Sequence, residues 1–161
     1  MNMEKLITGS VAVAYLRSGD KYLLMKRAAN KSHYPNVWDG VGGWVEDNEL
    51  REPGKAVLRE IYEESGIEES DIVALELKYL HISFEGGYLT HHYIYFGETC
   101  KTDVWQTDEG ALSWVERRDF LDREFSEAMG KMVRHYFEVG EKSGTAYIFA
   151  EYGDEGTFAP F

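Results

Sequence analysis

The sequence predicts a mixed α/β fold in one domain over residues 1–161. Short apolar runs with strand character occur along most of the chain, two segments between them carry helical patterns, and the two longest runs are joined by a glycine turn. Hairpin-linked strands pair antiparallel, whereas strands separated by a helix commonly pair parallel. A chain of 161 residues is long enough for one substantial core, and its three prolines leave no obvious linker.

The first third of the chain is predicted to form a β-hairpin, a loop and a third strand. Apolar runs at 6–16 and 21–26 are separated by the turn sequence RSGD, which predicts a β-hairpin. Residues 28–36 have the composition of a loop. The run at 37–45 is apolar but rich in glycine, so we expect a strand whose backbone passes close to another part of the molecule.

The remaining elements follow from helix and turn signals. Pro53 suits the first turn of a helix, the pattern continues over 55–65, and Gly66 ends it. Gly86 and Gly87 predict a tight turn between two long strands. The further elements that we expect are strands over 71–85, 88–99, 110–115 and 145–152 and a helix over 126–139, with Met129, Met132, Val133 and Tyr136 on its apolar face.

Composition and charge exclude several classes of function. With 29 acidic and 17 basic residues the net charge is −12, which argues against a surface for nucleic-acid polymers. A small anionic ligand remains compatible if a divalent cation lies between it and the protein. The single cysteine, Cys100, forms no internal disulfide, and neither a signal peptide nor a membrane span is recognisable, so we expect a cytoplasmic protein. An N-terminal edge strand is a candidate contact for a homodimer.

Three glutamates share one turn of the first helix. Glu60, Glu63 and Glu64 lie at helical spacings where like charges repel by roughly 0.2–0.5 kcal/mol per pair. On a helical projection Ala56 falls among them and leaves space above them. The opposite, apolar side is formed by Val57, Leu58, Ile61 and Tyr62. The carboxylates are therefore either a solvated face or the oxygen ligands of a hard cation such as Mg²⁺.

The sequence around these glutamates resembles the Nudix box, G-x5-E-x7-R-E-U-x-E-E-x-G-U, where U is a bulky aliphatic residue. Residues 59–67, REIYEESGI, match its second half at every defined position. Nine residues separate Glu49 from Arg59, where the pattern has seven. Counting forward from Gly43 places Glu49 on the first glutamate of the box, and counting back from Arg59 places Arg51 there. The two extra residues lie between positions 47 and 52 in either case.

This resemblance implies a Nudix-type α/β/α sandwich with a mixed β-sheet and a glutamate-bearing catalytic helix. It implies hydrolysis of a nucleoside diphosphate linked to another group, with Mg²⁺ or Mn²⁺ as cofactor and a small-molecule nucleotide as substrate. By position in the box, Glu60, Glu64 and the Gly42 carbonyl are the expected metal ligands. Glu63 is a further ligand or the base that orients water, and Arg59 holds the loop and the carboxylates in place.

Residues outside the box have weaker assignments. Glu109 resembles a downstream acidic residue that serves as an extra metal ligand or base in some members of the family, with Asp108 as its competitor. The expected substrate-binding residues are Lys26, Arg27, Trp38 and Asp39. Each of these also has an ordinary structural explanation, as a turn residue, a solvated strand end or a core aromatic.

The box defines the bond that is cleaved and not the group attached to it. The stretch WDGVGGWVE resembles the branch that includes the MutT-like 8-oxo-dGTP diphosphatases, although residues 121–130 hold no clear counterpart of the acidic pair that reads the oxidised purine. Dinucleoside polyphosphates, nucleotide sugars, ADP-ribose and ordinary nucleoside triphosphates remain open. The alternative function is a nucleotide sensor without hydrolysis. Loss of a box glutamate would mark such a sensor, and here all three helix glutamates and Arg59 are present.

Overall fold

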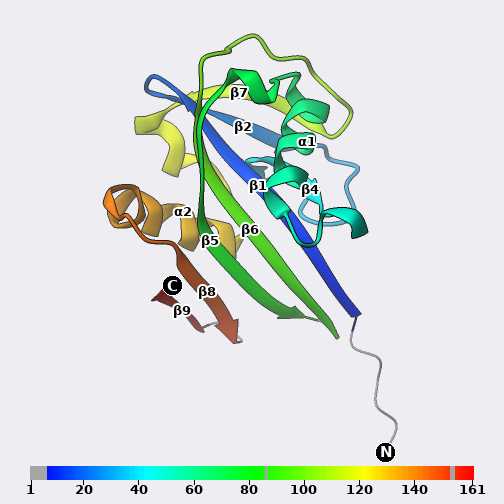
Figure 1. Ribbon diagram of the computed structural model, residues 1–161, viewed down its shortest axis with the longest axis vertical. Coiled ribbons are helices and arrows are strands. Elements are labelled where there is room, and N and C mark those ends of the chain that lie inside the picture. The colour runs from blue at the N-terminus through cyan, green and yellow to red at the C-terminus, as the bar shows by residue number, and fades with distance from the viewer. Residues whose placement is uncertain (1–6, 86, 153–154) are drawn as a thin grey trace, which may run out of the picture.

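The computed structural model describes residues 7–85, 87–152 and 155–161. These residues form three groups of strands separated by two α-helices, with short 3₁₀ helices between them (Figure 1). The strands are β1 (Ile7–Ser18), β2 (Lys21–Arg27), β3 (Trp38–Asp39), β4 (Val41–Trp44), β5 (Ile72–Glu85), β6 (Tyr88–Thr99), β7 (Gly110–Glu116), β8 (Tyr147–Tyr152) and β9 (Glu155–Pro160). The α-helices are α1 (Pro53–Ser65) and α2 (Glu127–Glu138), and the 3₁₀ helices are η1 (Asp47–Glu49), η2 (Glu69–Asp71), η3 (Arg117–Asp122) and η4 (Gly140–Lys142).

All the described strands belong to one mixed sheet. Its main order is β3-β2-β1-β6-β5-β8-β9, with β4 paired to β1 and β7 paired to β2. The β1–β6 and β5–β8 pairs are parallel, and the other pairs are antiparallel. The predicted fold class, a mixed-sheet α/β fold, is therefore confirmed.

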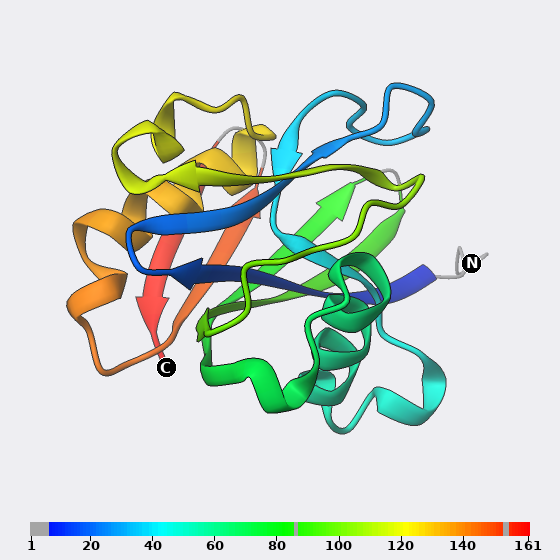
Figure 2. The same cartoon turned by 90° about the horizontal axis from the view of Figure 1, so that it is seen from above.

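The two α-helices lie on opposite sides of the sheet, as the two views show together (Figure 1, Figure 2). The core is correspondingly divided. On the α1 side the fully buried residues include Ala12, Ala14, Leu16, Leu23, Val41, Ala56, Val57, Ile61 and Ile67. On the α2 side the cluster is rich in aromatic and methionine side chains, including Tyr15, Tyr22, Tyr79, Phe120, Met132 and Phe149. Burial on both faces explains why residues 11–16 of β1 and 22–25 of β2 are apolar without interruption.

The two expected hairpins are present. The β1–β2 hairpin places Leu16 opposite Leu23, and the β5–β6 hairpin runs the length of both strands. Gly87 has a φ of +84°, a conformation that favours glycine, while Gly86 lies outside the described residues.

The glycine-rich run at 37–45 forms two short strands instead of the one expected. The backbone changes partner at Gly40: β3 pairs with β2, and β4 pairs with β1. A side chain at Gly42 would collide with the Ala12 carbonyl oxygen and reach within 2.6 Å of the Val13 Cα. The expected close backbone approach is thus made to β1, and it seats β4 beneath α1.

Two expectations about the sheet edges are wrong. The N-terminal strand β1 lies inside the sheet, because β4 and β2 pair on one side of it and β6 on the other, so it is not the edge strand that was expected. The strand at the opposite end, β9, was not expected, because residues 153–160 contain two glycines, an aspartate and a proline and read as irregular. Pairing with β8 overrides that weak local preference.

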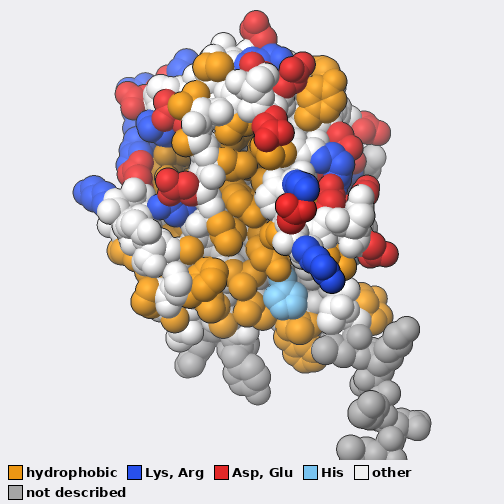
Figure 3. Space-filling view, in the orientation of Figure 1, with side chains coloured by type: hydrophobic (Ala, Val, Ile, Leu, Met, Phe, Trp, Pro, Cys, Tyr) orange, Lys and Arg blue, Asp and Glu red, His pale blue; other side chains and the backbone are white. Residues whose placement is uncertain are grey.

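On its side of the sheet, α1 packs on β1 and β4 and leaves the β5–β6 hairpin largely uncovered. Figure 3 shows apolar side chains down the centre of this face, with charged side chains gathered to either side of them. Among the described residues, no helix is long and apolar enough to cross a membrane.

Candidate active site

The helix α1 carries the three box glutamates, and its packing differs in part from the helical projection. Ala56, Val57 and Ile61 are fully buried against the sheet. The expectation that Ala56 lies open among the carboxylates is therefore wrong, because the helix approaches β1 and β4 at this small residue. Tyr62, expected on the apolar side, is 47% exposed and packs edge-on against Trp105 with ring centroids 5.4 Å apart.

The C-terminal turn of α1 is held by the loop between β6 and β7. Gly66 has a φ of +75° and its N–H donates to the Tyr62 carbonyl. The Trp105 indole N–H donates to the Glu63 carbonyl at 3.2 Å, and its backbone N–H donates to Ser65 at 3.1 Å. These bonds satisfy carbonyls that a helix end leaves unpaired, and so fix the turn that carries Glu63. Sequence reasoning missed Trp105, since nothing in its local pattern links it to a helix 40 residues away.

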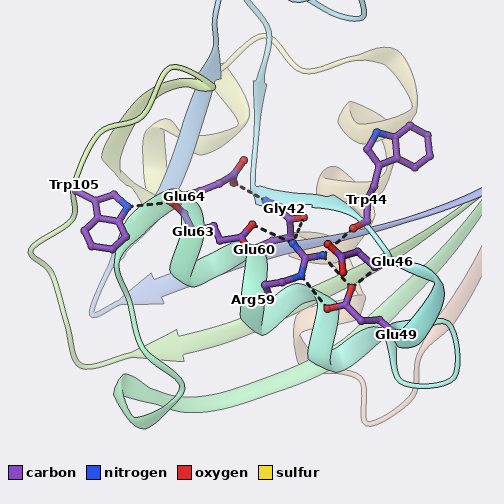
Figure 4. A network of polar contacts seen from close by, with 9 residues as sticks. All are labelled: Gly42, Trp44, Glu46, Glu49, Arg59, Glu60, Glu63, Glu64 and Trp105. Atoms are coloured by element: carbon purple, nitrogen blue, oxygen red, sulfur yellow. Dashed lines mark hydrogen bonds and ion pairs between the residues drawn. The ribbon is translucent and has the colours of Figure 1, made fainter.

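Arg59 lies at the centre of a network that joins α1, β4 and η1 (Figure 4). Its Nε and Nη2 donate to the two carboxylate oxygens of Glu49, each at 2.9 Å, and Nη2 also donates to the Trp44 carbonyl at 3.0 Å. Its Nη1 donates to Glu60 at 2.7 Å and to Glu63 at 3.0 Å. One guanidinium therefore orients three carboxylates.

The geometry decides between the two alignments of the box. Glu49, only 8% exposed, is the acidic residue that contacts Arg59, and the Arg59 hydrogen bonds lower the pKa of its carboxyl. Arg51 is exposed, as is its neighbour Leu50. The two extra residues are thus accommodated in the loop between η1 and α1, and the Glu49–Arg59 contact is kept.

Glu64 is the most buried of the three helix glutamates, at 7% exposure. One of its oxygens accepts a hydrogen bond from the Gly42 N–H at 2.8 Å. Burial, followed by repulsion from Glu60, Glu109 and Asp39, raises the pKa of Glu64 to about 8, against the lowering effect of the Gly42 bond. In a strand the N–H and C=O of one residue point to the same side, so the Gly42 carbonyl also faces this carboxylate cluster.

Glu60 and Glu63 occupy different environments on the same helix. Glu60 packs against the β4 backbone, and a side chain at Gly43 would come within 2.6 Å of its carboxyl group. Burial raises the pKa of Glu60, although the hydrogen bond from Arg59 opposes this. Glu63 is the most exposed of the three, with 55% of its side chain accessible, and one of its oxygens is held by Arg59. It is therefore the glutamate best able to contact water.

Asp39 lies next to the cluster, on β3. One of its oxygens accepts hydrogen bonds from the Tyr15 hydroxyl at 2.6 Å and from the Gly40 N–H at 2.8 Å. Burial raises the pKa of Asp39, while those hydrogen bonds and the positive charge of Arg27 oppose the rise. Because the charges of Asp39 and Glu64 repel each other, Asp39 belongs to the same site as the helix glutamates.

The other expected substrate-binding residues are separated by the sheet. Lys26 pairs directly with Trp38, so these two side chains share one face, and Lys26 is exposed. Arg27, the next residue, points to the other face. The guanidinium of Arg123 lies 5.2 Å from the centre of the Trp38 ring. Of the two expected cations, therefore, only Arg27 is placed beside the carboxylates.

Glu109 reaches the site from the start of β7. Its charge raises the pKa of Glu64, and its carboxylate accepts a hydrogen bond from Lys31, in the loop between β2 and β3. Asp108, its competitor, makes no such contact among those found for the described residues. Sequence reasoning missed Lys31, which appeared only as one residue of a polar loop.

The donor set suits a hard divalent cation. Two carboxylates, Glu60 and Glu64, and one backbone carbonyl, Gly42, are oxygen donors of the kind that Mg²⁺ prefers when substrate phosphates and water complete its shell. Burial, and after it repulsion from neighbouring carboxylates, raises the pKa of Glu64, as expected for an acidic group without a full counter-charge. In the part of the chain that the structure describes, no three His, Cys, Asp or Glu side chains converge as a ready-made metal site. Basic side chains form ion pairs with three of the acidic residues: Arg59 with Glu60 and Glu63, and Lys31 with Glu109.

A comparison with protein-family models decides the family. The NUDIX domain model matches residues 7–136, which span β1 to α2 and include every site residue described above. The chain belongs to the Nudix family. Nudix hydrolases act on nucleoside diphosphates linked to another moiety, and this chain is accordingly a Nudix hydrolase. No curated protein sequence matches the chain.

Solved Nudix structures share the fold at low sequence identity. A MutT protein from Bacillus halodurans aligns with a TM-score of 0.70 and 19% identity, covering 94% of this chain and 97% of that one. A MutT protein from Methanosarcina mazei aligns with a TM-score of 0.68 and 22% identity, covering 86% and 99%. An Ap4A hydrolase from C. elegans aligns with a TM-score of 0.56 and 20% identity, covering 82% and 96%.

Proposed function

We propose that this Nudix hydrolase is a Mg²⁺-dependent pyrophosphohydrolase that splits the phosphoanhydride of a free nucleotide and releases a nucleoside monophosphate. The observation that carries the proposal is the cluster of Asp39, Glu60, Glu64 and Glu109, in which burial, and after it repulsion from the other three charges, raises the pKa of Glu64 to about 8. Such a cluster costs folding free energy unless a cation neutralises it. Mn²⁺ offers the same coordination chemistry and is the alternative cofactor.

Glu60, Glu64 and the Gly42 carbonyl would hold the cation. When bound, it would polarise the phosphoryl oxygens, lower the pKa of a bound water and neutralise the developing charge on the leaving phosphate. Arg59 does not touch the substrate in this proposal. It keeps Glu60 and Glu63 in fixed orientations through its hydrogen bonds at 2.7 and 3.0 Å, so that the carboxylates need not reorganise during the reaction.

Glu63 is proposed as the residue that orients the attacking water. It is accessible, one of its oxygens is fixed by Arg59, and its other oxygen remains available to accept a proton or a hydrogen bond from water. Glu109 is the second candidate for this role, because its charge acts on Glu64.

Arg27 and Asp39 are proposed to contact the substrate. Arg27 supplies positive charge beside the carboxylates, and Asp39 keeps one carboxyl oxygen that neither Tyr15 nor Gly40 engages. Trp38 packs against the core on the α2 side of the sheet and is not assigned to the substrate. The resemblance to the MutT-like branch makes an oxidised nucleoside triphosphate the first substrate to test, and the structural likeness to an Ap4A hydrolase adds dinucleoside polyphosphates to the set.

We also propose a cytoplasmic location and no nucleic-acid polymer as partner. The chain's one cysteine, Cys100, is free and exposed, and exposed thiols persist in reducing compartments. The net charge of −12 opposes binding of a polyanion over a large surface.

The test is hydrolysis of a nucleotide panel by the purified protein with Mg²⁺. The panel holds 8-oxo-dGTP, the ordinary triphosphates, dinucleoside polyphosphates, ADP-ribose and nucleotide sugars, and products are separated by anion exchange. We expect a nucleoside monophosphate from at least one compound, with activity lost in EDTA and restored by Mg²⁺. Nucleotide binding measured by calorimetry without turnover of any compound would instead establish the sensor function.

A further inference from the structure

Lys31 places a positive charge at the carboxylate cluster from a loop that the box does not include. Its ammonium group donates to Glu109, and 26% of its side chain is exposed. The loop is joined to the start of β7 a second time, since the Ala28 N–H donates to the Glu109 carbonyl at 3.0 Å. The Lys31 N–H donates in turn to the Ala28 carbonyl at 3.2 Å. The loop after β2 is therefore fastened to the residue that faces Glu64.

The contact between Lys31 and Glu109 is of a kind that exchanges readily. Glu109 is 46% exposed, and ion pairs with this much solvent contact add little to stability. A diphosphate group carries several negative charges on closely spaced oxygens, so it is a stronger partner for an ammonium group than one solvated carboxylate is. A substrate phosphate near Glu64 and Glu109 would thus compete directly for Lys31.

The backbone of the same loop contains local strain. Tyr34 and Asn36 have φ values of +50° and +64°, in the left-handed region. Asparagine tolerates this region, whereas tyrosine has no such preference. The Tyr34 side chain is 57% exposed, so its packing offers little to offset the strain. Strained residues of this kind are found in segments that change conformation when a ligand binds.

The base of the loop has a second incomplete interaction. Arg27 donates through Nη2 to the His33 carbonyl at 3.2 Å, and its backbone carbonyl accepts from the Asn36 N–H at 3.2 Å. Its Nε is buried and has no hydrogen-bond partner among the described residues. A buried guanidinium N–H without a partner is costly. An acceptor such as a phosphate oxygen would satisfy this N–H.

From these observations we propose that Lys31 is a phosphate-binding residue that exchanges partners. In the empty site it neutralises Glu109. A bound di- or polyphosphate draws Lys31 away, and the released Glu109 then faces Glu64 as an additional carboxylate for the cation or for water. The exchange links phosphate binding to the completion of the catalytic carboxylates. This exchange rests on the proposed function. It adds to that function a positively charged residue outside the Nudix box, and it places phosphate binding before the release of Glu109.

The exchange predicts effects of opposite sign on two ligands. We would titrate Mg²⁺ alone, and inorganic pyrophosphate alone in EDTA at low ionic strength, into the wild type, Lys31→Gln and Glu109→Gln by calorimetry. Lys31→Gln is expected to weaken pyrophosphate binding about tenfold or more and to tighten Mg²⁺ binding several-fold, because the lysine no longer competes for Glu109. Glu109→Gln is expected to tighten pyrophosphate binding, because Lys31 is freed, and to weaken Mg²⁺ binding, because a carboxylate is removed.

Lys21→Gln is the matched control, because Lys21 pairs with Glu116 at the other end of β2 and should change neither affinity. If the Lys31–Glu109 pair were merely structural, each of the two variants would change its affinities for pyrophosphate and for Mg²⁺ in the same direction, or would change neither. Either result would overturn the exchange. Absence of measurable pyrophosphate binding by the wild type and by Glu109→Gln alike would also overturn it. A wild type that hydrolyses no nucleotide and binds no Mg²⁺ would instead refute the proposed function.

Discussion

Replacing Glu64 by glutamine is expected to lower the rate of nucleotide hydrolysis by about 10³-fold, or about 4 kcal/mol in the activation barrier, while the fold is retained. Glutamine keeps the shape of the side chain and an oxygen that can accept the Gly42 N–H, but it removes the negative charge that would hold the cation. The rate is measured at saturating substrate and over a range of Mg²⁺ concentrations, so that weaker cation binding is separated from slower chemistry.

Stability should not fall in this variant. Because the pKa of Glu64 is raised to about 8, the metal-free protein at pH 7 holds this carboxyl mostly protonated, and a neutral amide replaces it at little cost. Glu138→Gln, at an exposed position at the end of α2, is the control and should keep full activity. A Glu64→Gln enzyme within tenfold of the wild-type rate would show that this carboxylate does not take part in catalysis.

Replacing Arg59 by methionine is expected to cost about 3 kcal/mol of folding free energy as well as most of the activity. The change removes the guanidinium that donates to both carboxylate oxygens of Glu49, which is 8% exposed. Removal of one partner from a buried ion pair costs about 3–5 kcal/mol of folding free energy. For a chain of this size the melting temperature should fall by roughly 6–12 °C. Arg59→Lys should recover little, because an ammonium group cannot bridge both oxygens of Glu49.

Two comparisons make the Arg59 result interpretable. Arg17→Met breaks an exposed pair with Glu98, which is 38% accessible, and should cost less than about 1 kcal/mol. Adding Glu49→Gln to Arg59→Met should restore part of the lost stability, since the buried charge is then removed together with its partner. Equal losses in Arg17→Met and Arg59→Met, measured by chemical denaturation, would contradict the role given to the network.

The sequence predicted most of the fold because its local signals agree with the final structure. The RSGD turn, Pro53, Gly66 and the apolar phase of α2 each act over a few residues, and each appears where it was expected. The strand β9 could not be predicted from its own residues, because its stability comes from pairing with β8. The position of β1 inside the sheet likewise depends on β4 and β6, which contact it from distant parts of the chain.

The sequence predicted those site residues that lie close together along the chain and missed those that come from distant segments. Arg59, Glu60, Glu63 and Glu64 lie on one helix, so their spacing fixed their relative positions in advance. Lys31 and Trp105 reach the same site from separate loops, and only the tertiary structure brings them there. The open space expected above Ala56 is absent, because a projection of the helix does not reveal which arc the sheet covers.

The account rests on the claim that the glutamates of α1 bind a divalent cation, and the most direct measurement is the number of protons released when Mg²⁺ binds. The pKa of Glu64, about 8 without metal, means that most of this carboxyl is protonated at pH 7 and must lose its proton to become a ligand. Calorimetry in buffers of different ionisation enthalpy should give about one proton released per Mg²⁺ at pH 7, falling toward zero above pH 9. Glu64→Gln should abolish the release. Mg²⁺ binding with no proton release at pH 7, or with the same release in Glu64→Gln, would contradict the claim.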